Sequence, residues 1–192
     1  FGYTSHPSDD YEGFGVIYNL DTIGYSSQDN LPIYAVKLSA HADIKEAQPR
    51  VLILGQCHAE EIYGVEISME IINQFLHPEQ FQENRTFLQK GLYFTEIWIV
   101  PTYNPEGMRV VHGYVEDGDE IQDVTYRKNK RDTDNNGVFD FVDGIGQDLD
   151  GVDLNRNYNF NWIFGDTLLQ SCDPTVSDCS YNDDYDYYKG EY

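Results

Sequence analysis

The pattern of apolar and polar residues along the first hundred positions predicts strands that alternate with helices. Three segments run apolar or alternate, with β-branched and aromatic side chains, and we interpret them as strands at 15–23, 32–39 and 51–56. The third, Val-Leu-Ile-Leu-Gly-Gln, is continuously apolar up to its glycine. Such a run is typical of a strand buried on both faces of a parallel or mixed sheet.

The spacing of apolar residues becomes helical after the third strand. We predict a helix from Ala59 to Leu76, because apolar side chains recur at intervals of three and four residues. The side chains expected to face the core are Ile62, Val65, Met69 and Ile72, followed by Phe75 or Leu76. Glu60 and Glu61 would lie in the first turn, where the helix dipole favours negative charge. The pair His77-Pro78 ends the helix.

The following segments continue the alternation. We predict a second helix over 79–90 and a strand over 92–103, and strand, helix, strand is the order of an α/β sheet. From 104 to 192 the chain is rich in Asp, Asn, Gly and Tyr, which predicts mostly loop. Long loops in a compact domain are usually functional or else disordered.

Charge narrows the class of partner. The chain of 192 residues suits one domain, and its 34 acidic against 12 basic residues give a formal net charge of -22. Nucleic acid and anionic membranes repel such a surface, so we expect neither as a partner. The sequence has no run of 18 apolar residues, so it predicts no membrane span. The acidic excess instead raises the expectation of bound cations such as calcium, or of a saline or extracellular setting.

The first residue and the cysteines bear on the compartment. The chain opens on Phe1 without a basic segment followed by an apolar one, so we expect a mature or trimmed chain. Cys172 and Cys179 lie in a polar, Asp-rich segment, and a small disulfide there would indicate an oxidising compartment; whether they pair stays open. Cys57 ends an apolar strand and is interpreted as a buried thiol. We expect a secreted, extracellular protein.

A histidine and a glutamate three residues apart come after the third strand. His58 and Glu61 would lie between a buried strand and a helix, at the sheet edge where open α/β folds place ligand sites. Zinc accepts both imidazole nitrogen and carboxylate oxygen. The spacing alone is common, however, and Glu60 competes with Glu61 for the role. The pair by itself therefore leaves metal binding open.

Three further motifs decide the interpretation. The four motifs, in order, are His58-Ala59-Glu60-Glu61, Asn104-Pro105-Glu106-Gly107, Tyr126-Arg127-Lys128-Asn129 and the Gly-Val-Asp-Leu-Asn-Arg-Asn-Tyr of 151–158. Together they resemble the zinc metallocarboxypeptidase family, in the catalytic domain of the carboxypeptidase A type, from about residue 20 to the end. The resemblance implies an α/β fold with a mixed, mostly parallel sheet flanked by helices.

The resemblance also implies roles for single residues. His58 and Glu61 would bind zinc, while Asn155 and Arg156 would hold the terminal carboxylate of a peptide or protein substrate, which an Arg fork contacts bidentately. Arg127 would stabilise the negative charge that develops on the scissile carbonyl oxygen. The alternative for Arg127 is a solvated member of the basic run 127–131. Zinc-activated water would then remove C-terminal residues.

The sequence departs from the family pattern after these four motifs. The family supplies a third ligand, a His, and later a general-base Glu, but this sequence has no His after His112, and the family's first helix also has no counterpart. We therefore interpret 1–192 as a partial catalytic domain, incomplete at both ends and inactive alone. It is a fragment, or it combines with a separate C-terminal portion of the same domain, or the remainder is lost.

Two other departures keep alternatives open. The family often has Arg immediately before the zinc-binding Glu, whereas here that position is Glu60, so subsite preference does not carry over. Cys57, which precedes His58, is a candidate for an extra soft ligand, although a strand-end neighbour normally points away. Cell-wall peptides are a second substrate class. From another class of function, the chain would be a non-catalytic, calcium-binding scaffold or assembly module derived from the same fold.

The acidic segment 132–153 predicts a calcium loop. Asp132, Asp134 and Asn136 occupy positions 1, 3 and 5 of a calcium loop, a glycine occupies position 6, and Asp143 stands at position 12 in place of the usual Glu. So many carboxylates would repel one another without a cation. The alternative is a flexible acidic loop. Because the segment connects the Arg127 and Asn155 motifs, ordering it would help to position both.

Overall fold

The computed structural model describes residues 11–142 and 150–158. It divides into two compact units, each described by itself below. The first unit comprises Phe1–Gly24, Pro32–Gln56 and Tyr63–Tyr103, and the second comprises Tyr25–Leu31, Cys57–Ile62 and Asn104–Tyr192. Among the described residues, none of the helices has both the length and the apolar character needed to cross a bilayer.

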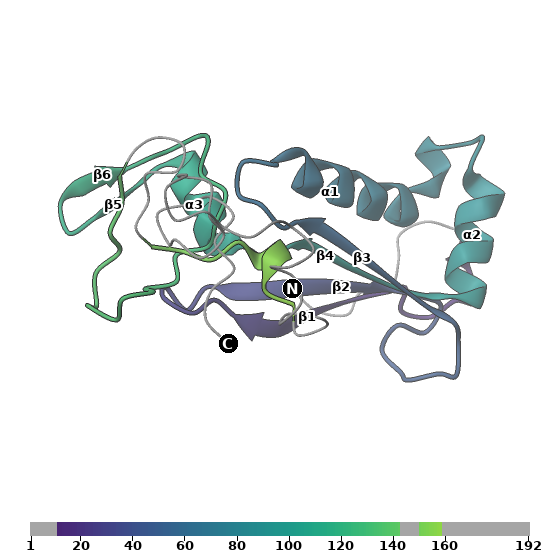
Figure 1. The fold of residues 1–192 in the computed structure, drawn as a ribbon. Coiled ribbons are helices and arrows are strands. Elements are labelled where there is room, and N and C mark those ends of the chain that lie inside the picture. The colour runs from purple at the N-terminus through teal and green to yellow at the C-terminus, as the bar shows by residue number, and fades with distance from the viewer. Residues whose placement is uncertain (1–10, 143–149, 159–192) are drawn as a thin grey trace. The chain divides into compact units, whose positions relative to one another are not determined.

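The first unit is built on a four-stranded sheet in the order β1-β2-β4-β3 (Figure 1). Its strands are β1 (Tyr18–Tyr25), β2 (Pro32–Leu38), β3 (Arg50–Gln56) and β4 (Glu96–Thr102). Strand β4 pairs antiparallel with β2, where Val36 lies opposite Ile99, and parallel with β3, where Ile53 lies opposite Ile99. The expected mixed sheet is confirmed, but parallel pairs do not predominate among these two pairings of β4.

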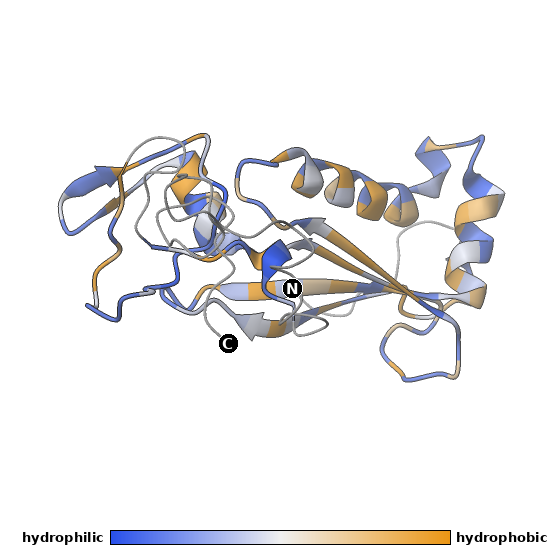
Figure 2. Cartoon of the chain, viewed as in Figure 1, coloured by the Kyte–Doolittle hydropathy of each residue, from blue (hydrophilic) through white to orange (hydrophobic). Residues whose placement is uncertain are grey.

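Two helices form the core of the first unit against one face of this sheet. They are α1 (Tyr63–Leu76) and α2 (Arg85–Phe94), with the short 3₁₀ helix η2 (Pro78–Gln80) between them. Ile72 of α1 and Leu92 of α2 pack in one apolar cluster with Ile99 of β4, which is fully buried. Figure 2 shows the corresponding apolar colour along the strands and on α1. The apolar patterning of the sequence therefore decides which faces meet.

The first helix begins later than the sequence predicts. It starts at Tyr63 and not at Ala59, so Glu60 and Glu61 precede it, and the expectation that they lie in its first turn is wrong. The backbone N–H of Ala59 donates to the carbonyl of Arg127 at 3.1 Å, while that of Glu61 donates to the carbonyl of His58 at 3.1 Å. The second bond closes a turn before the helix, and the first attaches this segment to the one around Arg127.

The buried face of α1 also differs in part from the expected one. Ile72 and Phe75 are buried as predicted, but Met69 is half exposed and Ser68 is buried in its place. The reason is close packing at Gly55 of β3, where a Cβ atom would lie 2.6 Å from Ser68 Oγ and would also clash with the carbonyl of Pro101. The helix lies so near the strand that only a small side chain fits between them.

The second predicted helix and the strand after it are shifted. The helix was expected over 79–90 and the strand over 92–103, whereas α2 continues to Phe94 and β4 begins at Glu96. Leu88 and Leu92 are both buried at helical spacing, and this shared apolar face keeps the chain helical past residue 90.

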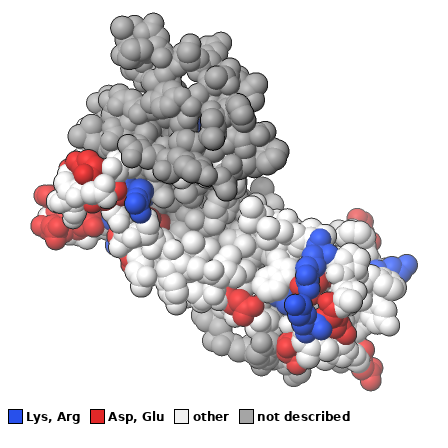
Figure 3. Space-filling model, turned by 60° about the horizontal axis from the view of Figure 1, so that its bottom comes forward, with Lys and Arg blue, Asp and Glu red and all other residues white. Residues whose placement is uncertain are grey.

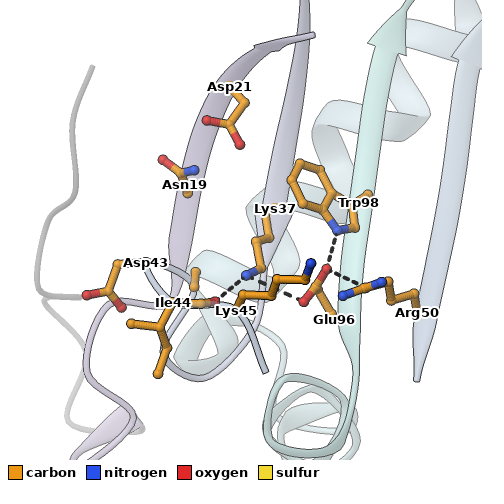
Figure 4. A pocket seen from close by; sticks show the side chains of 10 residues that line it. Asn19, Asp21, Lys37, Asp43, Ile44, Lys45, Arg50, Glu96 and Trp98 are labelled. Carbon is orange, nitrogen blue, oxygen red and sulfur yellow. Dashed lines mark hydrogen bonds and ion pairs between the residues drawn. The ribbon is translucent and has the colours of Figure 1, made fainter. Parts of the chain in front are cut away.

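A polar network covers the opposite face of the sheet (Figure 4). The carboxylate of Glu96, only 4% exposed, accepts hydrogen bonds from Trp98 Nε1 at 2.7 Å and Arg50 Nε at 2.9 Å, and lies 3.5 Å from Lys37 Nζ. Burial alone would raise the pKa of Glu96, but these partners lower it. Lys37 Nζ also donates to the carbonyl of Ile44 at 2.7 Å, which ties the loop before β3 to the sheet beside an open cavity of about 510 Å³.

Charged side chains of both signs lie close together on one face of the structure. On the face drawn in Figure 3, Lys and Arg side chains lie next to Asp and Glu side chains, although the chain carries a net charge of -22. On this face, basic side chains thus lie beside part of the acidic excess.

The second unit contains elements that the sequence analysis assigned to loop. They are α3 (Pro105–His112), the antiparallel hairpin of β5 (Tyr114–Glu116) and β6 (Asp119–Ile121), and the 3₁₀ helix η3 (Leu154–Arg156). Their core consists of Val110 and Val111 of α3 with Ala59, Ile121 and Tyr126. The expectation of mostly loop after residue 104 is therefore wrong for 105–121, where one short amphipathic helix and one hairpin carry too few apolar residues to stand out in the sequence.

Candidate active site

Asn104 organises the segments that carry the candidate site. Its side-chain Nδ2 donates to the carbonyls of Cys57 and Lys128, both at 3.0 Å, and its Oδ1 accepts the backbone N–H of Gly107 at 3.1 Å. One buried amide therefore caps α3 and joins the segment after β3 to the segment around Arg127. This is the structural role of the Asn-Pro-Glu-Gly motif.

Gly107 is required by the same junction. A Cβ atom at this position would lie 2.8 Å from the Cβ of Ala59 and would clash with the carbonyl of Lys128. The absence of a side chain lets α3 contact both segments directly.

The basic run 127–131 is largely enclosed. Lys128 and Lys130 are each 1% exposed, which excludes the alternative of a solvated basic strip. Lys130 Nζ donates to Asp29 Oδ1 at 3.0 Å and to Glu116 Oε2 at 2.9 Å, so it joins the segment 25–31 to β5. Arg127 is thereby held in a fixed stretch of backbone.

His58 lies between two carboxylates. Its side chain is buried, with Nε2 3.1 Å from Oδ1 of the fully buried Asp153 and Nδ1 3.1 Å from Glu61 Oε1. The second contact is close but not aligned as a hydrogen bond, and Nδ1 has no hydrogen-bond partner. Burial by itself would lower the pKa of His58, but Asp153 outweighs this effect and raises it.

All three guanidinium nitrogens of Arg127 contact side chains of this site. Nε donates to Asp153 Oδ2 at 2.9 Å, Nη1 donates to Glu60 Oε1 at 3.1 Å, and Nη2 lies 2.8 Å from His58 Nε2. Although burial opposes its charge, the hydrogen bond to Asp153 and the neighbouring carboxylates raise the pKa of Arg127. The guanidinium is therefore a fixed cation beside the candidate metal ligands.

The structure brings some of the predicted site residues together and leaves others at the margin. The side chains of His58, Glu61 and Arg127 lie together. Glu60 contacts Arg127 and does not take the place of Glu61 beside His58. Asn155 and Arg156 lie in η3, immediately after Asp153, and the backbone N–H of Asn155 donates to Asp153 Oδ1 at 2.9 Å. Asp153 thus links the candidate zinc ligands to the candidate carboxylate-binding pair.

The donor set fits zinc. Two ligand atoms of one tetrahedral zinc ion, each about 2.0 to 2.2 Å from the metal, lie about 3.3 to 3.6 Å apart. The separation of 3.1 Å between His58 Nδ1 and Glu61 Oε1 is near this range. Among the described residues, the buried side-chain atoms without a hydrogen-bond partner are His58 Nδ1, Glu60 Oε2 and Asp132 Oδ1. The first two lie at this site.

The third unpartnered atom lies in the acidic segment. Oxygens of Asp132, Asp134 and Asp150 all lie within 4.8 Å of one another. Asp132 and Asp134 belong to the predicted calcium set, and Asp143 lies outside the described residues. Asn136 was expected to offer its side-chain oxygen to calcium. Instead, its Nδ2 faces the acidic side chains and donates to Asp134 and to Asp140. Asp150, buried and not predicted as a ligand, completes the cluster.

Asp153 is the residue that the sequence analysis missed. It is the Asp of the Gly-Val-Asp-Leu-Asn-Arg motif, two positions before Asn155, and it contacts both His58 and Arg127. A carboxylate within a motif that already supplies binding residues was the available signal, because histidine ligands usually donate their second nitrogen to such a group.

Comparison with known proteins identifies the family of the chain. The family model described as zinc carboxypeptidase matches residues 13–186. A curated zinc carboxypeptidase from Saccharothrix mutabilis subsp. capreolus is 26% identical over 159 residues, which are 83% of this chain and 30% of that protein. The chain thus spans about a third of that relative's length.

Two solved structures share the fold. Carboxypeptidase A from Helicoverpa armigera has a TM-score of 0.56 at 18% identity, over 94% of this chain and 36% of the other. Thrombin-activatable fibrinolysis inhibitor has a TM-score of 0.52 at 19% identity, over 78% of this chain and 31% of the other. With the family model matching most of its length, the chain belongs to the zinc carboxypeptidase family.

Proposed function

We propose that this chain supplies part of a zinc-dependent active site that removes single residues from the C-termini of peptides. His58 and Glu61 are the proposed zinc ligands, Arg127 the catalytic cation, and Asn155 and Arg156 the groups that hold the substrate's terminal carboxylate. The observation that carries the proposal is the contact of His58 and Arg127 with the two oxygens of one buried carboxylate, Asp153.

The carboxylate gives His58 the form that a metal requires. When Nε2 donates its proton to Asp153, the lone pair of Nδ1 is free on the side of Glu61. A carboxylate behind a histidine ligand also orients the ring and increases its basicity. Bound zinc would polarise the scissile carbonyl and activate a water molecule.

Arg127 and the residues after Asp153 supply the substrate contacts. The guanidinium is held by Asp153 and Glu60, so a cation is kept beside the metal site where it can stabilise a developing oxyanion. Arg156 lies in η3, and a guanidinium fork matches a terminal carboxylate in geometry and charge. In this proposal the buried Asp153 helps to position both guanidinium groups, that of Arg127 by direct contact and that of Arg156 through the adjacent backbone.

The proposed reaction also requires groups beyond those named. The described residues offer two zinc ligands at this site, and no His follows His112 in the sequence. A third ligand and a general base are therefore expected from another portion of the same catalytic domain, which we propose as the partner of this chain. An extracellular location remains part of the proposal and rests on the charge of -22.

The experiment is a calorimetric zinc titration of the 192-residue chain. Wild type is expected to bind one zinc ion weakly, whereas His58→Ala and Glu61→Gln abolish binding. Glu61 is exposed, so its replacement leaves the fold intact. His77→Ala, a change at a half-exposed histidine outside the site, serves as the control and retains binding. Zinc binding that survives both site changes would exclude this metal site.

A calcium-binding scaffold is the second candidate function. It is supported by the convergence of Asp132, Asp134 and Asp150 and by the unpartnered Oδ1 of Asp132. The response to metals separates the two candidates. A scaffold would bind calcium, and His58→Ala would leave the scaffold otherwise unchanged.

A further inference from the structure

We propose that Glu60 is a positioning residue that controls Arg127 and thereby sets the zinc affinity of His58. The inference rests on the zinc site proposed above. It concerns a residue that is not a metal ligand and whose carboxylate contacts Arg127 through one of its two oxygens, Oε1.

Two neighbours make conflicting demands on one nitrogen atom of His58. His58 Nε2 lies 3.1 Å from Asp153 Oδ1 and 2.8 Å from Arg127 Nη2. A ring nitrogen that carries a proton can donate to Asp153, and one without a proton can accept from Arg127, but it cannot do both. The two neighbours therefore favour opposite tautomers of the neutral imidazole.

Only one of these tautomers can bind a metal at Nδ1. If Nε2 accepts from Arg127, the proton of the neutral ring resides on Nδ1, and no lone pair faces Glu61. If Nε2 donates to Asp153, Nδ1 is free to coordinate. The contact between Arg127 and His58 thus opposes metal binding, and it must be released when zinc enters.

Glu60 provides the place to which the guanidinium can turn. Its Oε1 already accepts from Arg127 Nη1 at 3.1 Å, while its Oε2 is buried and has no hydrogen-bond partner. Arginine and carboxylate groups commonly form two parallel hydrogen bonds. When Nη2 leaves His58, Glu60 Oε2 is the acceptor that completes such a pair.

Glu60 also balances the charge beside the metal. The three carboxylates of Glu60, Glu61 and Asp153 and the guanidinium of Arg127 leave two negative charges, which match one zinc ion. Without Glu60, the Arg127 cation would be held mainly by Asp153 and would remain on His58. Both arguments predict that Glu60 favours zinc binding, and the release of His58 predicts that the larger part of this effect passes through Arg127.

The first test is a double-mutant cycle with zinc affinity as the readout. Glu60→Gln is expected to weaken zinc binding about tenfold, the lower end of the effect of groups that support metal ligands. Glu60→Asp, which keeps the carboxylate, should restore most of the affinity. Arg127→Gln should bind zinc at least as well as wild type, and in that background Glu60→Gln should lose most of its effect.

The control and the contrary outcomes separate this inference from the zinc site itself. Glu120→Gln removes the same charge from an exposed position of β6 and should leave zinc affinity unchanged. An equal effect of Glu60→Gln with and without Arg127 would reduce Glu60 to a bulk charge and overturn the inference. Absence of zinc binding by wild type would overturn the proposed function and this inference with it.

A second readout does not depend on zinc. Nitrogen-15 spectra of the imidazole distinguish the two neutral tautomers of His58 in the metal-free chain. Glu60→Gln should shift the population toward the tautomer protonated at Nδ1, and Arg127→Gln should shift it toward the one protonated at Nε2. Identical populations in the three proteins would refute the control of His58 by Glu60 and Arg127, whatever the zinc affinity.

Discussion

At the scale of single residues, the candidate site depends on side chains whose partners lie far away in the sequence. Asp153 divides its two oxygens between His58 and Arg127, and Asn104 joins three segments through one amide. Both are buried and hydrogen-bonded, as buried polar groups must be if burial is not to cost stability. Such residues fix geometry without themselves reacting.

Gly107→Ala is predicted to destabilise the protein by about 1–3 kcal/mol, the usual cost of overpacking. The added Cβ would clash with the carbonyl of Lys128 and approach Ala59, and neither backbone can move without disturbing Asn104. Urea unfolding measures the change. Gly24→Ala is the matched control, since a Cβ there meets nothing within 4 Å, and a loss of stability equal to that of the control would contradict the prediction.

At the scale of elements, each face of the sheet of the first unit has its own kind of contact. One face packs apolar side chains of α1 and α2, and the other carries the buried pair of Lys37 and Glu96 (Figure 4). Lys37 and Leu38 are consecutive in β2, so their side chains point to opposite faces of the sheet. A mostly apolar strand can therefore bury a charged side chain on one face.

Glu96→Gln is predicted to lower the free energy of unfolding at pH 7 by about 3 kcal/mol, since it leaves the buried Lys37 without its charged partner. The folded-state pKa of Glu96 is lowered, so its stabilisation is full above the pKa of an unfolded Glu, about 4.3, and is lost as pH falls through the folded value. The variant should therefore lose less stability than wild type between pH 7 and pH 3. Parallel curves would contradict this account.

Calcium is predicted to raise the melting temperature of the chain, because it would bind between Asp132, Asp134 and Asp150 and relieve their repulsion. Asp134→Asn should reduce the shift by more than half. Asp119→Asn, at an exposed position of β6, should leave it unchanged. A melting temperature that does not respond to millimolar calcium would rule out the calcium loop.

At the scale of the whole molecule, this chain spans only part of the length of the zinc carboxypeptidases that it matches. It covers 30% of its curated relative and 36% of the Helicoverpa armigera enzyme. The two zinc ligands proposed among the described residues, His58 and Glu61, are fewer than the three protein ligands usual in a catalytic zinc site. Zinc affinity and peptide hydrolysis therefore need separate measurements.

The 192-residue chain alone is predicted to release no C-terminal residue from peptides, even with zinc present. The missing third ligand would leave zinc weakly bound, and no general base would be available. Amino-acid release from a peptide panel, measured by mass spectrometry, checks this. Release that requires His58 and exceeds the rate without protein would show that the chain is sufficient for catalysis.

The sequence by itself determined the family, and it placed the ends of the first-unit strands and helices to within six residues. Apolar periodicity and short motifs are local, so they can be recognised without folding the chain. Only the tertiary structure decided that Glu60 contacts Arg127, that Asp153 supports His58, and that Asp150 joins the acidic cluster. Those contacts join residues up to 95 positions apart, and packing rather than local pattern selects them.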